Sequence, residues 1–286
     1  MSVLEFNVYK SQRMTGGNNK PNILTFELLE DVLSLPSSQY EPLLALSAVS
    51  RIGPLVEYAY HDIGSAHRRL SSHGHSMTAK QLEQAIGTSS IAGARSLSLD
   101  SNSHHEFIRT PQERLEMEDS RWLAFCQRLV DAAVKSGLQK SFARALVGTF
   151  EEMTSNIIEH SNNPLTGLAG YQWRPGEFEY VVVDGGIGVL ESLRKHSDYN
   201  WVLDSGQALE VALQDGESRF GRAAHRGTGF HTLTTNIALR NSVLRFRSGD
   251  HSYTMDGTTA PLMKEIQSCS PFPGFLTSIT TQIPKA

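Results

Sequence analysis

The segment FEEMTSNIIEHSNN, residues 150–163, contains the pattern from which the fold can be predicted. Apolar residues recur in it and just before it at spacings of four, three and four: Leu146, Phe150, Met153 and Ile157. This spacing is typical of one face of an α-helix, so a helix is expected over about Lys140–His160. Its apolar stripe is expected to face the protein core.

A line of polar residues runs along the same predicted helix, about a quarter turn away from the apolar stripe. Glu152, Asn156 and His160 form this line at intervals of four. Three other polar residues are expected to face water: Glu151, Ser155 and Glu159. The polar line can simply mark the border of an amphipathic helix, but asparagine is unfavourable inside a helix and usually has a partner. The line is therefore a candidate wall of a binding site.

The second informative stretch is VVVDGGIGV, residues 181–189. A β-branched run ends there in Asp184, which places a carboxylate at the end of a predicted buried strand. Gly186 and Gly188 follow, and glycines let a ligand approach the backbone closely. An Asp-Gly pair is also a turn signal, so the stretch taken alone fits a tight turn as well.

The third stretch is GRAAHRGTGFHTL, residues 221–233. Gly227, Thr228 and Gly229 precede a predicted helix, whose free N–H groups and positive dipole end could meet an anion. Arg226 lies beside them and could add positive charge against a phosphate. The stretch lacks the Lys-Ser/Thr of a P-loop, and DGGIG lacks the spaced glycines of a dinucleotide fingerprint.

The rest of the pattern predicts an α+β fold, a two-layer sandwich with helices on one face of a mixed, mostly antiparallel sheet. A helix is expected to end at Gly137 after SRWLAFCQRLVDAAVKSG. Strands are expected at GLAGYQW and FEYVVV, joined by the turn RPGE, and at SVLRFRSG, HSYTM and GFLTSITTQIP. Further helices are expected at SGQALEVALQDG and GFHTLTTNIAL.

Two domains are expected. Residues 1–112 would form a mainly helical N-terminal region that ends in a flexible linker, because about Gly87–Glu113 is rich in Ser, Gly, Asn and His. Residues 113–286 would form the second domain, which contains all three informative stretches.

Composition points to a soluble cytoplasmic protein. The 286 residues carry a formal net charge of −4 and no block of like charge, so neither direct nucleic-acid binding nor membrane binding is expected. Only two cysteines, Cys126 and Cys269, occur, which favours a reducing compartment over a disulfide scaffold. The N-terminal residues lack the layout of a signal peptide.

The three stretches, in this order, resemble the GHKL family of ATP-binding domains, which includes sensor histidine kinases, DNA gyrase B, MutL and the anti-sigma factor kinases. EEMTSNIIEH and RGTGFHTL are most similar to the asparagine helix and the second glycine box of the anti-sigma factor kinases. The resemblance covers about Trp122–Pro284 and leaves about the first 110 residues unmatched. It implies the histidine-kinase-like ATPase fold for residues 113–286.

The resemblance implies a role for each matched position. Asn156 would bind Mg²⁺ through its side-chain oxygen, and Asp184 would accept a hydrogen from the adenine amino group. Glu152 would orient or deprotonate the attacking group as the catalytic carboxylate. The other nucleotide-binding positions are His160 beside the nucleotide, Gly186 and Gly188 against the base, Arg226, Gly227, Thr228 and Gly229 over the phosphates, and Thr277 assisting the aspartate.

These roles imply a regulatory protein that binds ATP and Mg²⁺ and phosphorylates a Ser or Thr of a partner protein. Two alternatives stay open: a slow ATPase switch, in which a lid at Gly216–Thr228 closes on nucleotide, and a non-catalytic nucleotide-sensing interaction module. About 38 residues, Leu190–Gly227, separate the glycine boxes, which is more than a minimal anti-sigma factor kinase needs. No upstream segment resembles the phosphoacceptor helix of sensor histidine kinases. The sequence leaves open whether the chain acts alone or as a homodimer.

Overall fold

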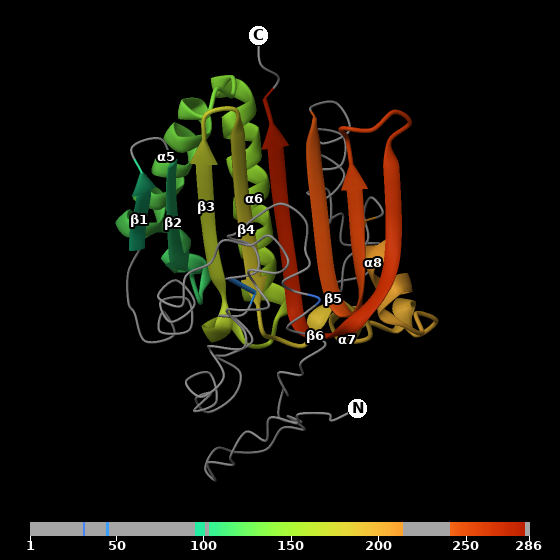
Figure 1. Ribbon diagram of the computed structural model, residues 1–286. Coiled ribbons are helices and arrows are strands. Elements are labelled where there is room, and N and C mark those ends of the chain that lie inside the picture. The colour runs from blue at the N-terminus through green and yellow to red at the C-terminus, as the bar shows by residue number, and fades with distance from the viewer. Residues whose placement is uncertain (1–30, 32–43, 46–94, 101–102, 214–240, 284–286) are drawn as a thin grey trace, which may run out of the picture. The chain divides into compact units, whose positions relative to one another are not determined.

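The computed structural model describes residue 31 and residues 44–45, 95–100, 103–213 and 241–283 (Figure 1). The chain divides into two units, Met1–Ile91 and Ala92–Ala286, and every strand and helix named below belongs to the second. The predictions for most of the N-terminal region, and for the helix at GFHTLTTNIAL, lie outside the described residues and remain predictions. No helix in the described part has the length and apolar character needed to cross a membrane.

A six-stranded sheet organises the described part of the second unit, with strand order β1-β2-β3-β4-β6-β5. The strands are β1 (Arg95–Asp100), β2 (Ser103–Arg109), β3 (Leu168–Arg174), β4 (Glu177–Asp184), β5 (Ser242–Asp256) and β6 (Met263–Gln282). All neighbouring strands in this sheet are antiparallel. The predicted α+β class is therefore confirmed, and the described sheet contains no parallel pair of the kind that "mixed" implied.

Within the described residues, four helices accompany the sheet, and the longest has the predicted bounds. They are α5 (Ser120–Lys135), α6 (Lys140–His160), α7 (Gly188–Leu193) and α8 (Ser205–Ala212), with short 3₁₀ turns η2 (Arg114–Glu118), η3 (Pro164–Thr166) and η4 (Ser197–Tyr199). The carboxylate of Asp119 accepts a hydrogen bond from the backbone N–H of Arg121 and thereby caps the start of α5. After α5, Gly137 takes a φ of 112°, as expected for a glycine that ends a helix.

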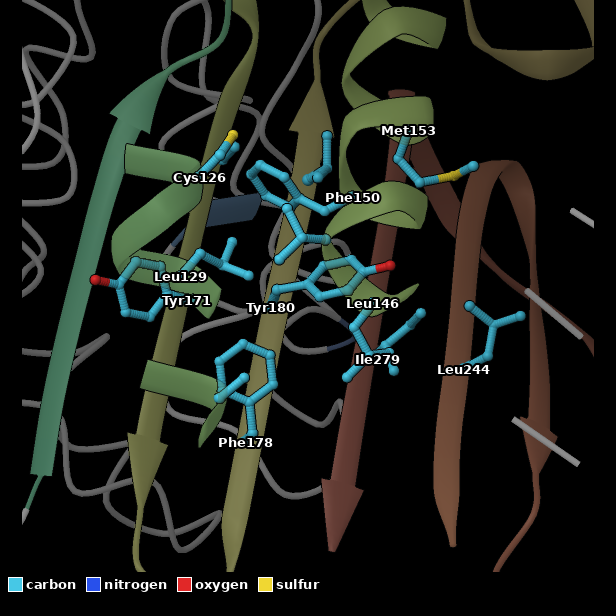
Figure 2. Packing of buried hydrophobic residues seen from close by; sticks show 14 of the residues in the cluster. Cys126, Leu129, Leu146, Phe150, Met153, Tyr171, Phe178, Tyr180, Leu244 and Ile279 are labelled. Carbon is cyan, nitrogen blue, oxygen red and sulfur yellow. The ribbon is translucent and has the colours of Figure 1, made fainter. Parts of the chain in front are cut away.

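The core lies between the sheet and the pair α5 and α6 (Figure 2). Phe150 is at its centre: its ring stacks on Trp122 of α5 at 5.7 Å and meets Tyr180 of β4 edge-on at 5.4 Å. The Tyr180 hydroxyl is satisfied by Thr149 at 2.7 Å, so this buried tyrosine leaves no polar atom unpaired. The apolar stripe read from the sequence is thus the face of α6 that packs on the sheet and on α5.

Helix α6 runs parallel to strand β4, and both ends are joined by backbone hydrogen bonds. Where α5 ends and α6 is about to begin, Gly176 N–H donates to the carbonyl of Ser136 at 3.0 Å. Where α6 ends, Ile187 N–H donates to the carbonyl of Ser161 at 2.9 Å. The last turns of α6 and the last residues of β4 therefore meet at the same end of the sandwich.

The prediction of a flexible linker is wrong for Arg95–Asp100 and Ser103–Arg109, because these residues form strands β1 and β2. The polar composition of this stretch suggested a loop, but one of its charged residues is buried and has partners elsewhere in the chain. Glu106 of β2 is 3% exposed, Arg128 of α5 donates to it at 2.6 Å, and the Tyr171 hydroxyl of β3 donates to it at 2.6 Å. Charge-assisted hydrogen bonds of this kind offset the cost of burying a carboxylate. The predicted boundary at residues 112 and 113 falls after these strands, inside the second unit.

Strands β5 and β6 form a long hairpin that bends sharply (Figure 1). The pairing register shifts between Ser248 and His251, where Gly249 has a φ of 58°. The hairpin then folds back, so that Gly257 N–H donates to the carbonyl of Ser242 at 2.9 Å. The two stretches predicted as separate strands, SVLRFRSG and HSYTM, are the two sides of this bend.

Candidate functional site

Asp184 is the last residue of β4 and lies buried at the end of the sandwich. Strand alternation puts it on the same face as Tyr180 and Val182, towards the helices. Its side chain is enclosed, with the residue 3% exposed, and Oδ1 accepts a hydrogen bond from Gly186 N–H at 2.7 Å. Burial raises the pKa of this carboxyl to about 7, although the Gly186 hydrogen bond acts in the opposite direction.

Thr277 of β6 lies next to Asp184 on the same face of the sheet. It pairs with Val182, while Asp184 pairs with Phe275, so Thr277 and Asp184 are diagonal neighbours on adjacent strands. Thr277 is fully buried, and its hydroxyl oxygen has no hydrogen-bond partner among the described residues. A buried polar group left in this state costs about 1–3 kcal/mol.

The two predicted glycines of the DGGIG turn allow close packing at this end. A Cβ on Gly186 would lie 2.1 Å from the carbonyl oxygen of Ser161, at the end of α6. Gly188 has a φ of 76°, and a Cβ there would lie 2.7 Å from Ser248 Oγ. The turn is therefore pressed against α6 on one side and against the bend of the hairpin on the other.

Two further residues of this region were missed by the sequence reasoning. Gly274 has a φ of 82°, and a Cβ on it would come within 2.1 Å of the Asp184 carbonyl oxygen. The signal was the Pro-Gly pair inside PFPGF, a turn signal within an apparent strand. Thr166 of η3 accepts the N–H of Gly185 at 2.9 Å through its hydroxyl. Nothing local in the sequence indicated that contact.

The polar line of α6 lies at the same end of the sandwich as Asp184. Ser192 of α7 and His160 are joined through Oγ and Nδ1 at 3.3 Å, so this side of α6 faces α7. Asn156, one turn earlier, is half-buried, and its side chain forms no hydrogen bond with another described residue. Glu152, one turn earlier again, is exposed.

The expectation that Glu151, Ser155 and Glu159 face water is wrong. All three are half-buried, because α5 and η2 pack along this side of α6. Glu159 forms an ion pair with Arg114 of η2. Burial raises the pKa of Glu151, and a hydrogen bond with the Cys126 thiol opposes this shift. Glu152, by contrast, is exposed.

The predicted site residues thus fall into three groups. One end of the sandwich holds His160, Asp184, Gly186, Gly188 and Thr277, and Asn156 lies one helical turn before His160 on α6. Glu152 lies four residues before Asn156 on α6, which is about 6 Å along the helix axis at a rise of about 1.5 Å per residue. The remaining four, Arg226, Gly227, Thr228 and Gly229, lie outside the described residues, so their roles remain predictions.

A metal ion at this end of the sandwich would need oxygen or nitrogen ligands from nearby side chains. Within the described ranges, no group of three or more His, Cys, Asp or Glu side chains gathers around a common point. Mg²⁺ commonly takes one or two protein oxygens and completes its shell with phosphate and water. The Asn156 amide is an oxygen donor of that kind, and the residue is half-buried.

The chain was also compared with known proteins. No family model matches it, and the search of curated proteins found no match either.

Proposed function

We propose that this end of the sandwich binds ATP in the manner of the GHKL domains, and that residues 113–286 have the histidine-kinase-like ATPase fold. One observation carries the proposal: the Asp184 carboxyl and the Thr277 hydroxyl are buried side by side with unused hydrogen-bonding capacity. Buried polar groups in proteins are nearly always satisfied, so a polar ligand is expected here.

Adenine suits these two groups. The exocyclic amine of adenine donates to the ionised Asp184 carboxylate, and the Thr277 hydroxyl can donate to a ring nitrogen beside it. Guanine presents a carbonyl oxygen where adenine has its amine, and that oxygen would face the carboxylate lone pairs. The unfavourable contact selects adenine over guanine.

The triphosphate is expected to extend from the base towards the polar line of α6. Asn156 would hold the magnesium ion, whose chemistry is to neutralise phosphate charge during transfer. Arg226, Gly227, Thr228 and Gly229 would cover the phosphates, as the sequence predicts. His160 lies beside this path and is positioned by Ser192.

The activity that we propose is phosphoryl transfer to a Ser or Thr of a partner protein. Glu152 supports it, because this carboxylate is exposed on the same line of α6 as Asn156 and can be reached by a hydroxyl from another protein. In transfer it would orient that hydroxyl and accept its proton. The alternatives are hydrolysis by a bound water, which makes the protein an ATPase switch, and nucleotide sensing without catalysis.

Calorimetric titration of the full chain with ATP and with GTP, each with and without Mg²⁺, tests the proposal. We expect ATP to bind at least tenfold more tightly than GTP, and Asn156→Ala to remove most of the magnesium dependence. Glu152→Ala is the matched control on the same helix and should bind ATP as the wild type does. An absence of ATP binding to the wild type would refute the proposal. Labelled ATP with co-purifying proteins then separates transfer, hydrolysis and sensing.

A further inference from the structure

The bend of the β5–β6 hairpin holds a second cluster of reactive side chains, separate from the proposed nucleotide site. His251 Nδ1 lies 2.8 Å from Asp250 Oδ1, and His251 Nε2 lies 3.2 Å from Ser268 Oγ. Asp250 and His251 are on β5, and Ser268 is the register partner of His251 on β6. The three form a continuous Asp–His–Ser chain of hydrogen bonds.

The charge of Asp250 fixes the direction of these hydrogen bonds. Hydrogen bonds from His251 first, and then from the Ser205 hydroxyl of α8, lower the pKa of the Asp250 carboxyl. An ionised Asp250 accepts the Nδ1–H of His251, which leaves the Nε2 lone pair to accept the hydroxyl hydrogen of Ser268. This is the arrangement in which an imidazole acts as a base towards a serine hydroxyl.

The imidazole is held in place by the start of α8. A Cβ on Gly206 would lie 2.9 Å from His251 Cδ2, so the ring rests directly on the helix backbone. On the other side of the bend, a Cβ on Gly249 would lie 2.1 Å from Ser205 Oγ. The His251 ring thus contacts Asp250 of β5, Ser268 of β6 and the start of α8. These contacts limit its freedom to turn away from Ser268.

The nucleophilic end of the cluster is accessible. Ser268 is exposed, whereas the side chain of His251 is only 20% exposed. An exposed serine can form its hydrogen bonds with water and does not need a protein partner. The hydrogen bond of Ser268 to an oriented imidazole therefore points to activation of the hydroxyl. An adjacent base activates a hydroxyl that is otherwise a weak nucleophile.

We infer that Ser268 is an activated nucleophile that small activated carboxylic esters can acylate. Ser268 Oγ attacks the ester carbonyl carbon while His251 Nε2 accepts the hydroxyl proton. The alcohol or phenol of the ester leaves and takes that proton from His251, and the acyl group remains on Ser268. Water then attacks the acyl-serine with His251 as base, and releases the carboxylic acid and the free serine.

Mass spectrometry after brief treatment of the full chain with p-nitrophenyl acetate tests this inference. Peptide fragmentation separates acetyl groups on Ser268 from those on the neighbouring Cys269. We expect acetylation at Ser268 to be at least about 100-fold faster than at Ser141, an exposed serine on α6 outside the cluster. Equal rates at the two serines would overturn the inference, and this comparison needs no variant.

Variants then test the relay itself. His251→Gln should lower the Ser268 rate by about 100-fold or more, and Asp250→Asn should lower it by at least about tenfold. Gly206→Ala adds a methyl group against the ring and should also slow the reaction, whereas Ser252→Ala, one residue further along β5, should not. If His251→Gln reacts at the wild-type rate while its thermal unfolding is unchanged, His251 does not activate Ser268 and the inference is overturned.

Discussion

Ser161, at the end of α6, accepts the backbone N–H of Ile187 at 2.9 Å, and this hydrogen bond fixes the glycine turn against the helix. The contact is close because Gly186 has no side chain: a Cβ there would lie 2.1 Å from the same Ser161 carbonyl oxygen. The position of the turn against the end of α6 therefore depends on one residue without a Cβ.

Gly186→Ala should lower the free energy of unfolding by about 1–3 kcal/mol, because either the turn or the end of α6 must move. Urea unfolding followed by circular dichroism measures the effect. The control is Gly148→Ala, since a Cβ at Gly148 meets nothing within 4 Å inside the same helix. That variant should gain about 0.5–1 kcal/mol from helix propensity. Equal effects of the two substitutions would mean that the turn does not press on α6.

Asp184 should make the free protein less stable as the pH rises from about 4 to about 7. Its pKa is about 7 in the folded state, against an ordinary value of 3.8 for an aspartate in an unfolded chain, so between these values the folded state holds a proton that the unfolded state has lost. The stability contribution of the protonated carboxyl is complete below about pH 4 and is lost as the pH passes through 7. Asp184→Asn does not titrate, and its stability relative to the wild type should rise over this range and level off above it. A difference that stays constant with pH would contradict the raised pKa.

ATP affinity should fall below pH 7 if the base binds the ionised carboxylate. A proton must leave Asp184 before the adenine amine can donate to it, so the dissociation constant should rise by up to about tenfold per pH unit below the pKa. Titration calorimetry from pH 6 to pH 8 in buffers of different ionisation enthalpy measures both the affinity and the proton release. Asp184→Asn should show a weaker affinity without this proton release.

Phe150→Ala should lower the free energy of unfolding by about 3–5 kcal/mol, because the ring is fully buried between α5 and β4. Leu123→Ala is the matched control, as Leu123 lies on α5 but is 50% exposed. Its effect should stay within about 0.5 kcal/mol. Urea unfolding measures both variants. A small loss for Phe150→Ala would mean that the core does not centre on this ring.

The Glu106–Arg128 pair should respond unequally to loss of either partner. The side chain of Glu106 is 4% exposed and that of Arg128 is 46% exposed. Arg128→Met leaves a buried carboxylate with one partner fewer and should cost about 3–5 kcal/mol, whereas Glu106→Gln leaves an arginine that water can reach and should cost less. Unfolding of both variants in urea gives the comparison. Equal and negligible losses would indicate that β2 is not part of the cooperative fold.

Local periodicity predicted the helices and strands that bury one face and expose the other. Helix α6 has the bounds that its apolar spacing indicated, and β3 and β4 form the hairpin that RPGE suggested. Strands β1 and β2 were not predicted, because the partners that make Glu106 acceptable in a strand are 22 and 65 residues away. Composition alone cannot show that a carboxylate will meet an arginine and a tyrosine from two other elements.

The sequence by itself determined which residue types stand at the ends of α6 and β4, and it determined the α+β class, because periodicity and turn chemistry are local. The tertiary structure decided that the Thr277 hydroxyl, which has no partner among the described residues, lies beside Asp184. It also decided that Glu151 and Glu159 face α5 and η2 while Glu152 faces solvent, and that Ser268 meets His251. These relationships depend on strand register and on which side of a helix a neighbour covers. The strand register and the covered side of a helix are both set when distant segments pack, because hydrogen bonds form and apolar side chains are buried at the same time.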